Sequence, residues 1–219
     1  MPTLYGHPFS RTQRNIWMLN ELGIPFDLVP IDFRIGEAQT PKFLAMNPNA
    51  RVPVLVDDGF AIYESLAINL YLARKYPGPL SAAGIEEESL AVQWALWVTT
   101  EVDKPLLLAA MNHRLFPPED RDVHEGAMAL AKLDRPFKVL DAHLQRQDYL
   151  VGNRFTVADV NVASVMTLIP ICGIPTAAYP AMSAWLDRCQ QRPAALAAWQ
   201  DIDFSIPRPS AEELKAMFL

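Results

Sequence analysis

The chain has 219 residues, of which 51% are hydrophobic and 20% charged, a composition typical of a compact soluble protein with a sizeable core. Its 19 basic and 25 acidic residues give a net charge of −6, which argues against nucleic acid or an anionic membrane as the main partner. No run of eighteen apolar residues predicts a membrane span and no secretory signal precedes the first strand, so we expect a cytoplasmic protein.

The N-terminal third alternates between strand and helix signals. Thr3–Tyr5 predicts a short strand, and residues 11–22 place apolar side chains on one side of a helix that ends at Gly23. A second strand follows at Phe26–Val29, and Pro30 puts it at a sheet edge because proline has no N–H to donate. A strand, a helix and a strand in this order predict parallel strands with a right-handed crossover.

Two short apolar runs flank Asp58-Gly59, a dipeptide that is a strong hairpin signal. Helical periodicity resumes at Ser65 and stops near Tyr76, before Pro77. This order predicts a small mixed sheet covered by helices, so residues 1–77 are expected to form an α/β domain with the thioredoxin-like arrangement.

The remainder of the chain shows helical periodicity and no strand signals. Residues 78–88 are rich in proline, glycine, alanine and acid and are interpreted as a linker, and residues 89–219 are interpreted as an all-α domain. The expected helices are 87–115 with a kink at Pro105, 119–147 with Pro136 inside, one from Thr156, one over 180–192 and one over 194–199.

The helix that is expected to begin at Thr156 has a recognisable N-terminal capping motif. Thr156 can accept a hydrogen bond from the first turn, and Asp159 three residues later can reach back to the Thr156 N–H, so the pair predicts a capping box. Its simplest interpretation is structural.

Four motifs occur in order along the chain: LYGHPFSR, NPNARVPVL, YES and FTVADV. With these motifs the whole chain resembles the cytosolic glutathione transferases, of a serine-type, bacterial-like kind. The resemblance implies a homodimeric enzyme that joins glutathione, its co-substrate, to a small hydrophobic electrophile without a metal. Two residues depart from the family pattern, because Arg11 and Ala50 stand where relatives often have proline and glycine.

The resemblance also implies a glutathione site. The bond between Val52 and Pro53 should be cis, which would leave the Val52 backbone free to pair with the cysteinyl part of glutathione. Glu64 and Ser65 precede a helix whose N-terminus favours a carboxylate, and they are assigned to the γ-glutamyl ammonium and carboxylate. The alternative for Ser65 is a plain N-cap.

The resemblance suggests two further residues, Arg51 and Asp103, and position alone suggests Gln39. Arg51 and Gln39 could approach the glycyl carboxylate, and Asp103 could reach the γ-glutamyl ammonium across a dimer interface. Exposed surface residues are the ordinary alternative for each.

Ser10 is the expected catalytic residue, because its hydroxyl lies just before the first helix and can donate a hydrogen bond to the glutathione thiolate. Thr12 is a rival hydroxyl, whereas Tyr5 should lie one turn too early, within the first strand. The two cysteines have no metal-ligand or redox spacing, and neither is near Ser10, so a thiol-transfer mechanism is disfavoured.

The electrophile is expected between the two halves, against Phe9, Val102, Leu106 and Met111. The motifs leave other outcomes open: a glutathione-dependent isomerase, dehalogenase or peroxidase, or a non-catalytic interaction protein with the same scaffold.

Overall fold

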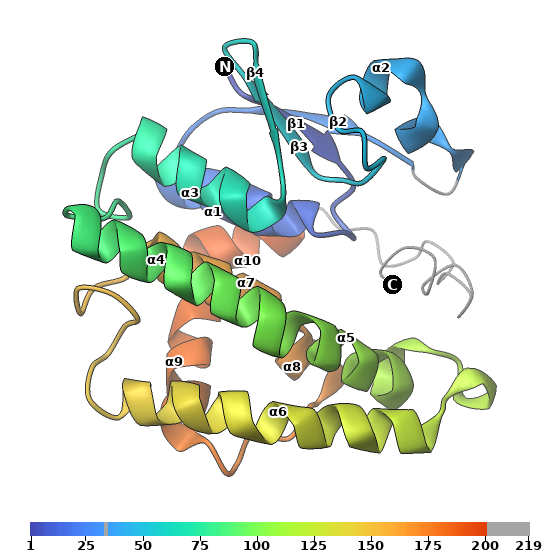
Figure 1. The fold of residues 1–219 in the computed structure, drawn as a ribbon, viewed down its shortest axis with the longest axis vertical. Helices are drawn as coiled ribbons and strands as arrows, with labels where there is room; N and C mark the ends of the chain where they lie inside the picture. Colours follow the sequence, from blue (N-terminus) through green and yellow to red (C-terminus); the bar gives the residue numbers. More distant parts are fainter. Residues whose placement is uncertain (33–34, 201–219) are drawn as a thin grey trace.

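A computed structural model describes residues 1–32 and 35–200, so the last part of the expected helical domain, 201–219, lies outside the described residues. The described chain forms a sheet-containing N-terminal domain stacked on a helical domain (Figure 1). None of its described helices combines the length and apolarity needed to cross a bilayer.

Four short strands form one mixed sheet in the order β2-β1-β3-β4. The strands are β1 (Thr3–Gly6), β2 (Asp27–Pro30), β3 (Val54–Asp57) and β4 (Phe60–Tyr63). β1 runs parallel to β2 and antiparallel to β3, and β3 and β4 form the predicted hairpin. Asp58 and Gly59 in its turn both have positive φ, which is why this dipeptide suits the position. The edge position of β2 confirms the interpretation of Pro30.

Two helices, α1 (Thr12–Leu22) and α3 (Ser65–Lys75), lie between the sheet and the helical domain (Figure 1). α1 ends at Gly23 with φ 63°, as its sequence predicted. The 3₁₀ turn η2 (Glu37–Gln39) and the short helix α2 (Pro41–Leu44) were not predicted. Thr40 caps α2 by accepting a hydrogen bond from the Phe43 N–H.

The helical domain contains two long helical stretches, one from α4 through η4 and one formed by α6, and a group of shorter helices. Their bounds are α4 (Ile85–Trp97), η3 (Val98–Asp103), α5 (Lys104–Ala110), η4 (Met111–Leu115), η5 (Pro118–Asp120), α6 (Val123–Leu144), α7 (Val157–Val165), α8 (Leu168–Cys172), α9 (Pro180–Gln190) and α10 (Pro193–Gln200).

Three details differ from the sequence-based expectation or add to it. α4 begins at Ile85, so the end of the expected linker is helical. Glutamates 86–88 lie in its first turn, where their negative charges interact favourably with the positive end of the helix dipole. At Pro105, where a kink was expected, the helix continues as α5 directly after the π-helical turn η3, whose wider turn accommodates the missing N–H. The short helix α8 was not predicted.

The two domains share one hydrophobic core. A single cluster of buried side chains runs from Leu4 and Leu55 in the sheet through Ile68 of α3 to Trp94 and Trp185 in the helical domain. Because α1 packs on α7 and α10, and α3 packs on α4 and α7, these two helices together join the domains. The contact is extensive and apolar, which favours a fixed arrangement of the two domains.

Candidate functional site

Ser10 lies in the turn that leads from β1 into α1. Its Oγ donates a hydrogen bond to the His7 carbonyl oxygen at 2.6 Å and lies 2.7 Å from Thr12 Oγ1. The Thr12 N–H also donates to Ser10 Oγ, at 3.2 Å. Ser10 is half-buried, at the open side of this turn, whereas Thr12 has no exposed surface. The geometry therefore favours Ser10 over Thr12 as the hydroxyl that meets a ligand.

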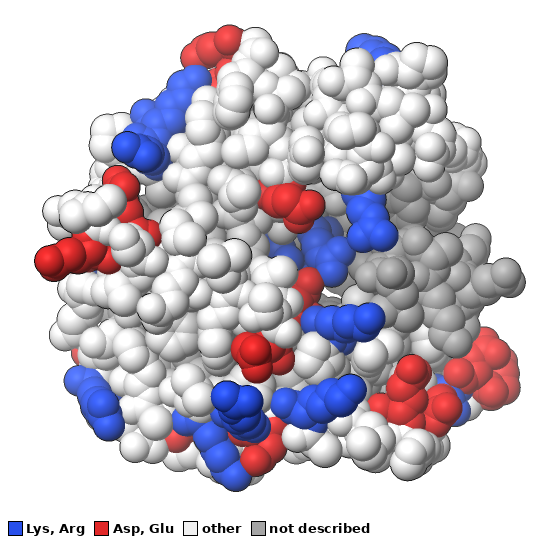
Figure 2. Space-filling view, viewed as in Figure 1, with Lys and Arg blue, Asp and Glu red and all other residues white. Residues whose placement is uncertain are grey.

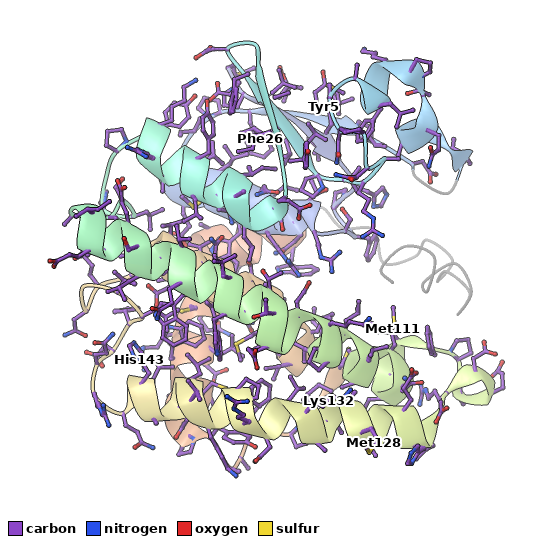
Figure 3. All side chains as sticks on the ribbon, viewed as in Figure 1. Tyr5, Phe26, Met111, Met128, Lys132 and His143 are labelled. Atoms are coloured by element: carbon purple, nitrogen blue, oxygen red, sulfur yellow. The ribbon has the colours of Figure 1, made fainter. Side chains whose placement is uncertain are left out.

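Tyr5 lies within β1, as its sequence position predicted. Alternation along the strand puts Leu4 in the core shared with α1 and α3, and puts Tyr5 on the other side of the sheet, packed with Phe43 of α2. Figure 3 shows Tyr5 at the sheet, on the side away from the helical domain. Its side chain does not compete with Ser10.

The N-terminus of α3 forms a second part of the site. Its N-cap is Glu64, which has φ 69° and makes no capping hydrogen bond through its side chain. Such a φ is strained for a residue with a Cβ, and strain of this kind gathers at binding sites. Ser65 is the first helical residue rather than the cap, and its hydroxyl is buried. The positive end of the helix dipole is thus left for an anion.

The loop before β3 carries the cis peptide bond expected between Val52 and Pro53. Asn47 holds this loop, because its side-chain amide donates to the Arg51 carbonyl oxygen at 2.7 Å and its Oδ1 accepts from the Asn49 N–H at 3.0 Å. Asn47 is almost fully buried. The loop geometry is therefore set by an internal side chain and leaves Val52 partly exposed.

A cluster of charges joins α1 to the helical domain beside Ser10. Asp103 of η3 accepts from Arg11 Nη2 at 2.8 Å and from Arg14 Nη2 at 2.7 Å. Burial raises the pKa of Asp103, but the two guanidinium groups outweigh it and lower that pKa overall. Burial likewise lowers the pKa of Arg14 despite Asp103. Figure 2 shows basic and acidic side chains gathered around a hollow where the two domains meet.

Arg14 also connects the charge cluster to α3. Its Nη1 lies 3.5 Å from Ser65 Oγ, a long hydrogen bond. Arg14 was not among the residues expected at the site, although its position one helical turn after Ser10 is a sequence signal for it. Asp103 was expected to reach across a dimer interface, and in this structure its carboxylate is held by two arginines of its own chain.

Behind the site, three buried asparagines hold the helix starts together. Asn15 Nδ2 donates to the Ser65 carbonyl oxygen at 2.8 Å and to Asn69 Oδ1 at 2.7 Å. Asn69 Nδ2 donates to Asn161 Oδ1 at 2.9 Å, and Asn161 Nδ2 donates to the Leu66 carbonyl oxygen at 3.3 Å. This chain of amides links α1, α3 and α7. The sequence signal was an asparagine within each otherwise apolar helix face.

The other expected site residues are divided between surface and core. Gln39 and Arg51 are exposed, Gln39 in η2 and Arg51 beside Val52. Phe9 is half-buried and stacks on His7, with ring centroids 5.9 Å apart.

Three of the four residues expected to line the acceptor site have no exposed surface: Val102, Leu106 and Met111. Val102 and Leu106 belong to the main core, and Met111 packs with Leu107 and Phe116 at the far end of α5 (Figure 3). In this structure all three side chains pack in the interior of the helical domain.

The fold and site together define a class: a thioredoxin-like domain with a hydroxyl at the start of α1, a cis-proline loop and an open helix N-terminus, followed by a helical domain. Within the described residues, no group of three His, Cys, Asp or Glu side chains is placed to hold a metal ion.

Comparison with known proteins agrees with this class. Residues 2–74 match the glutathione S-transferase N-terminal domain family, and residues 104–193 match the glutathione S-transferase C-terminal domain family. The chain is similar to glutathione S-transferase 3 of Zea mays, with 34% identity over 94% of this chain and 95% of that protein. It is also similar to glutathione S-transferase theta-1 of Mus musculus, with 35% identity over 85% of this chain and 81% of that protein.

A solved structure of glutathione S-transferase-I bound with lactoylglutathione superimposes with a TM-score of 0.82 and 28% identity, covering 90% of this chain and 97% of that one. The chain therefore belongs to the glutathione S-transferase family. The two relatives come from a plant and a mammal, and they give no support to the bacterial-like assignment.

Proposed function

We propose that this chain holds the thiol of glutathione as a thiolate at Ser10 and directs it at a small hydrophobic electrophile. The observation that carries the proposal is the position of Ser10. Its hydroxyl lies at the start of α1, one helical turn before Arg14, whose Nη1 lies 3.5 Å from Ser65 Oγ at the uncapped start of α3. A hydroxyl donor and an anion-binding helix end are thereby brought to one place by two different elements.

We assign the parts of glutathione by charge. The γ-glutamyl carboxylate belongs at Ser65 and the N-terminus of α3, where N–H groups and the helix dipole favour an anion, and Glu64 takes the ammonium group. The Val52 backbone pairs with the cysteinyl peptide, and the glycyl carboxylate meets Arg51 with help from Gln39. The exposure of both Arg51 and Gln39 leaves them accessible to such a ligand.

Ser10 would act as a hydrogen-bond donor and not as a base. A free thiol has a pKa of about 8.5, so little of it is ionised at neutral pH. A hydroxyl that donates to the sulfur anion favours the ionised form and lowers the thiol pKa. The thiolate then forms the carbon–sulfur bond as the electrophile loses its leaving group or accepts the electron pair.

The electrophile is placed against Phe9, since Phe9 alone among the four expected acceptor residues has exposed surface in this structure. We assign Val102, Leu106 and Met111 to the packing that holds η3 and α5 in position beside it.

We also propose that the protein is a homodimer that acts in the cytoplasm. Exposed apolar side chains on α4 and α6 support the dimer: Leu96 is 62% exposed and Met128 is 51% exposed. Met128 borders a cavity of about 450 Å³ between η3–α5 and α6, and Figure 3 shows Met128 on α6. Two buried cysteines, Cys172 and Cys189, are free thiols, as is usual for cytoplasmic proteins.

The dimer proposal is tested by the mass of the protein in solution. Leu96→Asp should produce monomers, whereas Leu196→Asp, at an exposed leucine of α10, should leave the mass unchanged. A wild-type protein that sediments as a monomer at micromolar concentration contradicts the proposal.

The catalytic proposal is tested with Ser10→Ala. Glutathione should raise the melting temperature of wild type and variant alike, because most binding contacts remain. The variant should lose about 10–100-fold in kcat/KM with a model electrophile, and its thiol should ionise at higher pH. Ser89→Ala, an exposed hydroxyl on α4, is the matched control. No melting shift with glutathione overturns the whole proposal, and an unchanged pH profile removes the role of Ser10.

A further inference from the structure

The hydrogen bonds around Ser10 determine in which direction each proton points. The His7 carbonyl oxygen can only accept, so in this structure the Ser10 proton points to it across the 2.6 Å contact. Ser10 and Thr12 share one further contact, 2.7 Å between their oxygens. Because the Ser10 proton is already used, the Thr12 hydroxyl must donate to Ser10 Oγ.

Thr12 thus supports Ser10 twice, through its hydroxyl and through its backbone N–H at 3.2 Å. Both bonds fill the acceptor positions of Ser10 Oγ, so they can persist when the Ser10 proton turns from the His7 carbonyl oxygen toward a ligand. A hydroxyl that accepts hydrogen bonds is also a stronger donor, because the bonds polarise one another.

The orientation of Thr12 is imposed by Gly6. A Cβ on Gly6 would overlap Thr12 Oγ1 and crowd its methyl carbon, so the side chain of Thr12 sits where only glycine leaves room. Thr12 has no exposed surface, and Ser10 Oγ is the one partner of its hydroxyl among the described residues. Burial and close packing therefore hold the hydroxyl in a single direction.

From this geometry we infer that Thr12 is a positioning residue: its buried hydroxyl, seated against Gly6, donates to Ser10 Oγ and so keeps the Ser10 proton available for the sulfur anion. The inference rests on the proposed function. Ser10 and Thr12 are then not alternatives, because there is a division of labour in which Ser10 touches the thiolate and Thr12 acts through Ser10.

The charged and titratable groups around this turn are His7 in the same loop, Arg11 and Arg14 of α1, and Asp103 of η3 with Glu64 at the start of α3. A substitution of Thr12 by valine changes none of them. A change in the pH profile of that variant therefore reports on the hydrogen bond to Ser10.

The experiment compares Thr12→Val, Thr12→Ser and Gly6→Ala with wild type. Thr12→Val should lower kcat by about 3–10-fold, the value of one hydrogen bond, with KM for glutathione within about twofold of wild type. The ultraviolet absorbance of the bound thiolate should appear at higher pH. Thr12→Ser should restore both properties, and Gly6→Ala should reproduce the valine defect by displacing the Thr12 hydroxyl.

Thr167→Val is the matched control, because Thr167 is a buried threonine whose hydroxyl bonds to helix carbonyls far from Ser10. It should change the melting temperature without moving the pH profile. Equal defects in Thr12→Val and Thr12→Ser, or a normal pH profile in Thr12→Val, overturn the inference.

Ser10→Ala separates this inference from the function on which it rests. A defect in Ser10→Ala combined with normal Thr12→Val removes only the role of Thr12. Normal activity in Ser10→Ala combined with a defect in Thr12→Val overturns both the proposed role of Ser10 and the division of labour.

Discussion

Ala50 illustrates how one backbone conformation links sequence to stability. The loop that presents Val52 requires φ 53° at this position, in the left-handed region. Relatives often have glycine here, and glycine adopts this region without the steric cost that a Cβ incurs. The chain therefore carries local strain directly before its cis-proline loop.

Ala50→Gly should stabilise the protein by about 0.5–1 kcal/mol, because removing the Cβ relieves this cost. Ala45→Gly is the matched control: Ala45 has φ −64° at the end of α2, and glycine should destabilise it by a similar amount. Urea unfolding measures both. A loss of stability in Ala50→Gly contradicts this account of the loop.

Arg11 is the second departure from the family pattern, and the structure explains it. Where proline is common in relatives, the arginine side chain binds Asp103 at 2.8 Å and adds a second cation to the Arg14–Asp103 pair. Arg11, whose sequence position indicates an exposed helix start, is therefore part of the contact between the domains.

At the scale of elements, α7 shows how a helix start becomes a centre of packing. The predicted capping box is present: Thr156 Oγ1 accepts from the Ala158 N–H, and Asp159 Oδ2 accepts from the Thr156 N–H at 2.9 Å. Asp159 Oδ1 additionally accepts from the Leu150 N–H at 3.0 Å and from Trp185 Nε1 at 2.9 Å. One buried carboxylate thus ties α7 to a loop and to α9.

Asp159→Ala should destabilise the protein by about 3–4 kcal/mol, which exceeds the 1–2 kcal/mol of a cap alone, because several buried donors lose their acceptor. Asp122→Ala removes the cap of α6, an exposed side chain that accepts from the Glu125 N–H and from no other group among the described residues. The change should cost about 1 kcal/mol. Thermal or urea unfolding of the two variants compares them. Equal losses would show that Leu150 and Trp185 contribute nothing.

At the scale of the molecule, contacts distant in sequence fasten the two domains over their shared core. Asp103 binds Arg11 and Arg14, and Arg192 of the helical domain binds Glu21 of α1 through two hydrogen bonds, at 2.6 and 2.8 Å. The pairs lie at opposite ends of α1, so this helix is held at both ends.

Asp103→Asn should reduce the free energy of unfolding by about 2–4 kcal/mol at neutral pH, because it leaves two partly buried arginines without their anion. The pKa of Asp103 is lowered in the folded state, so the unfolded chain takes up the proton first as the pH falls. The stabilisation is therefore full above the unfolded pKa of about 3.9 and is lost as the pH falls below it.

Urea unfolding at a series of pH values and a fixed protein concentration measures this difference. The gap between wild type and Asp103→Asn should be constant between about pH 6 and 8 and should narrow below about pH 4. Asp134→Asn, in the exposed pair with Lys138, should have a much smaller effect. A gap that does not change with pH would show that the carboxylate charge is not what joins the domains.

The sequence by itself determined what depends on neighbours along the chain. Asp58-Gly59 specifies a turn because its backbone tolerates positive φ, and Pro30 lies at a sheet edge because it lacks an N–H. Thr156 and Asp159, three residues apart, cap the start of α7 because each side chain reaches the backbone N–H groups of the same turn. The motifs around Ser10, Val52 and Glu64 likewise identified the family, since each is a short local pattern.

Only the tertiary structure decided which distant side chains meet. Nothing in local spacing indicates that Asp103 binds Arg14, that Asn15, Asn69 and Asn161 form one chain of hydrogen bonds, or that Val102 and Leu106 are fully buried. Periodicity shows that a side chain is apolar and which face it shares, but burial and pairing depend on how helices pack. The site at Ser10 is recognised from sequence and completed by packing.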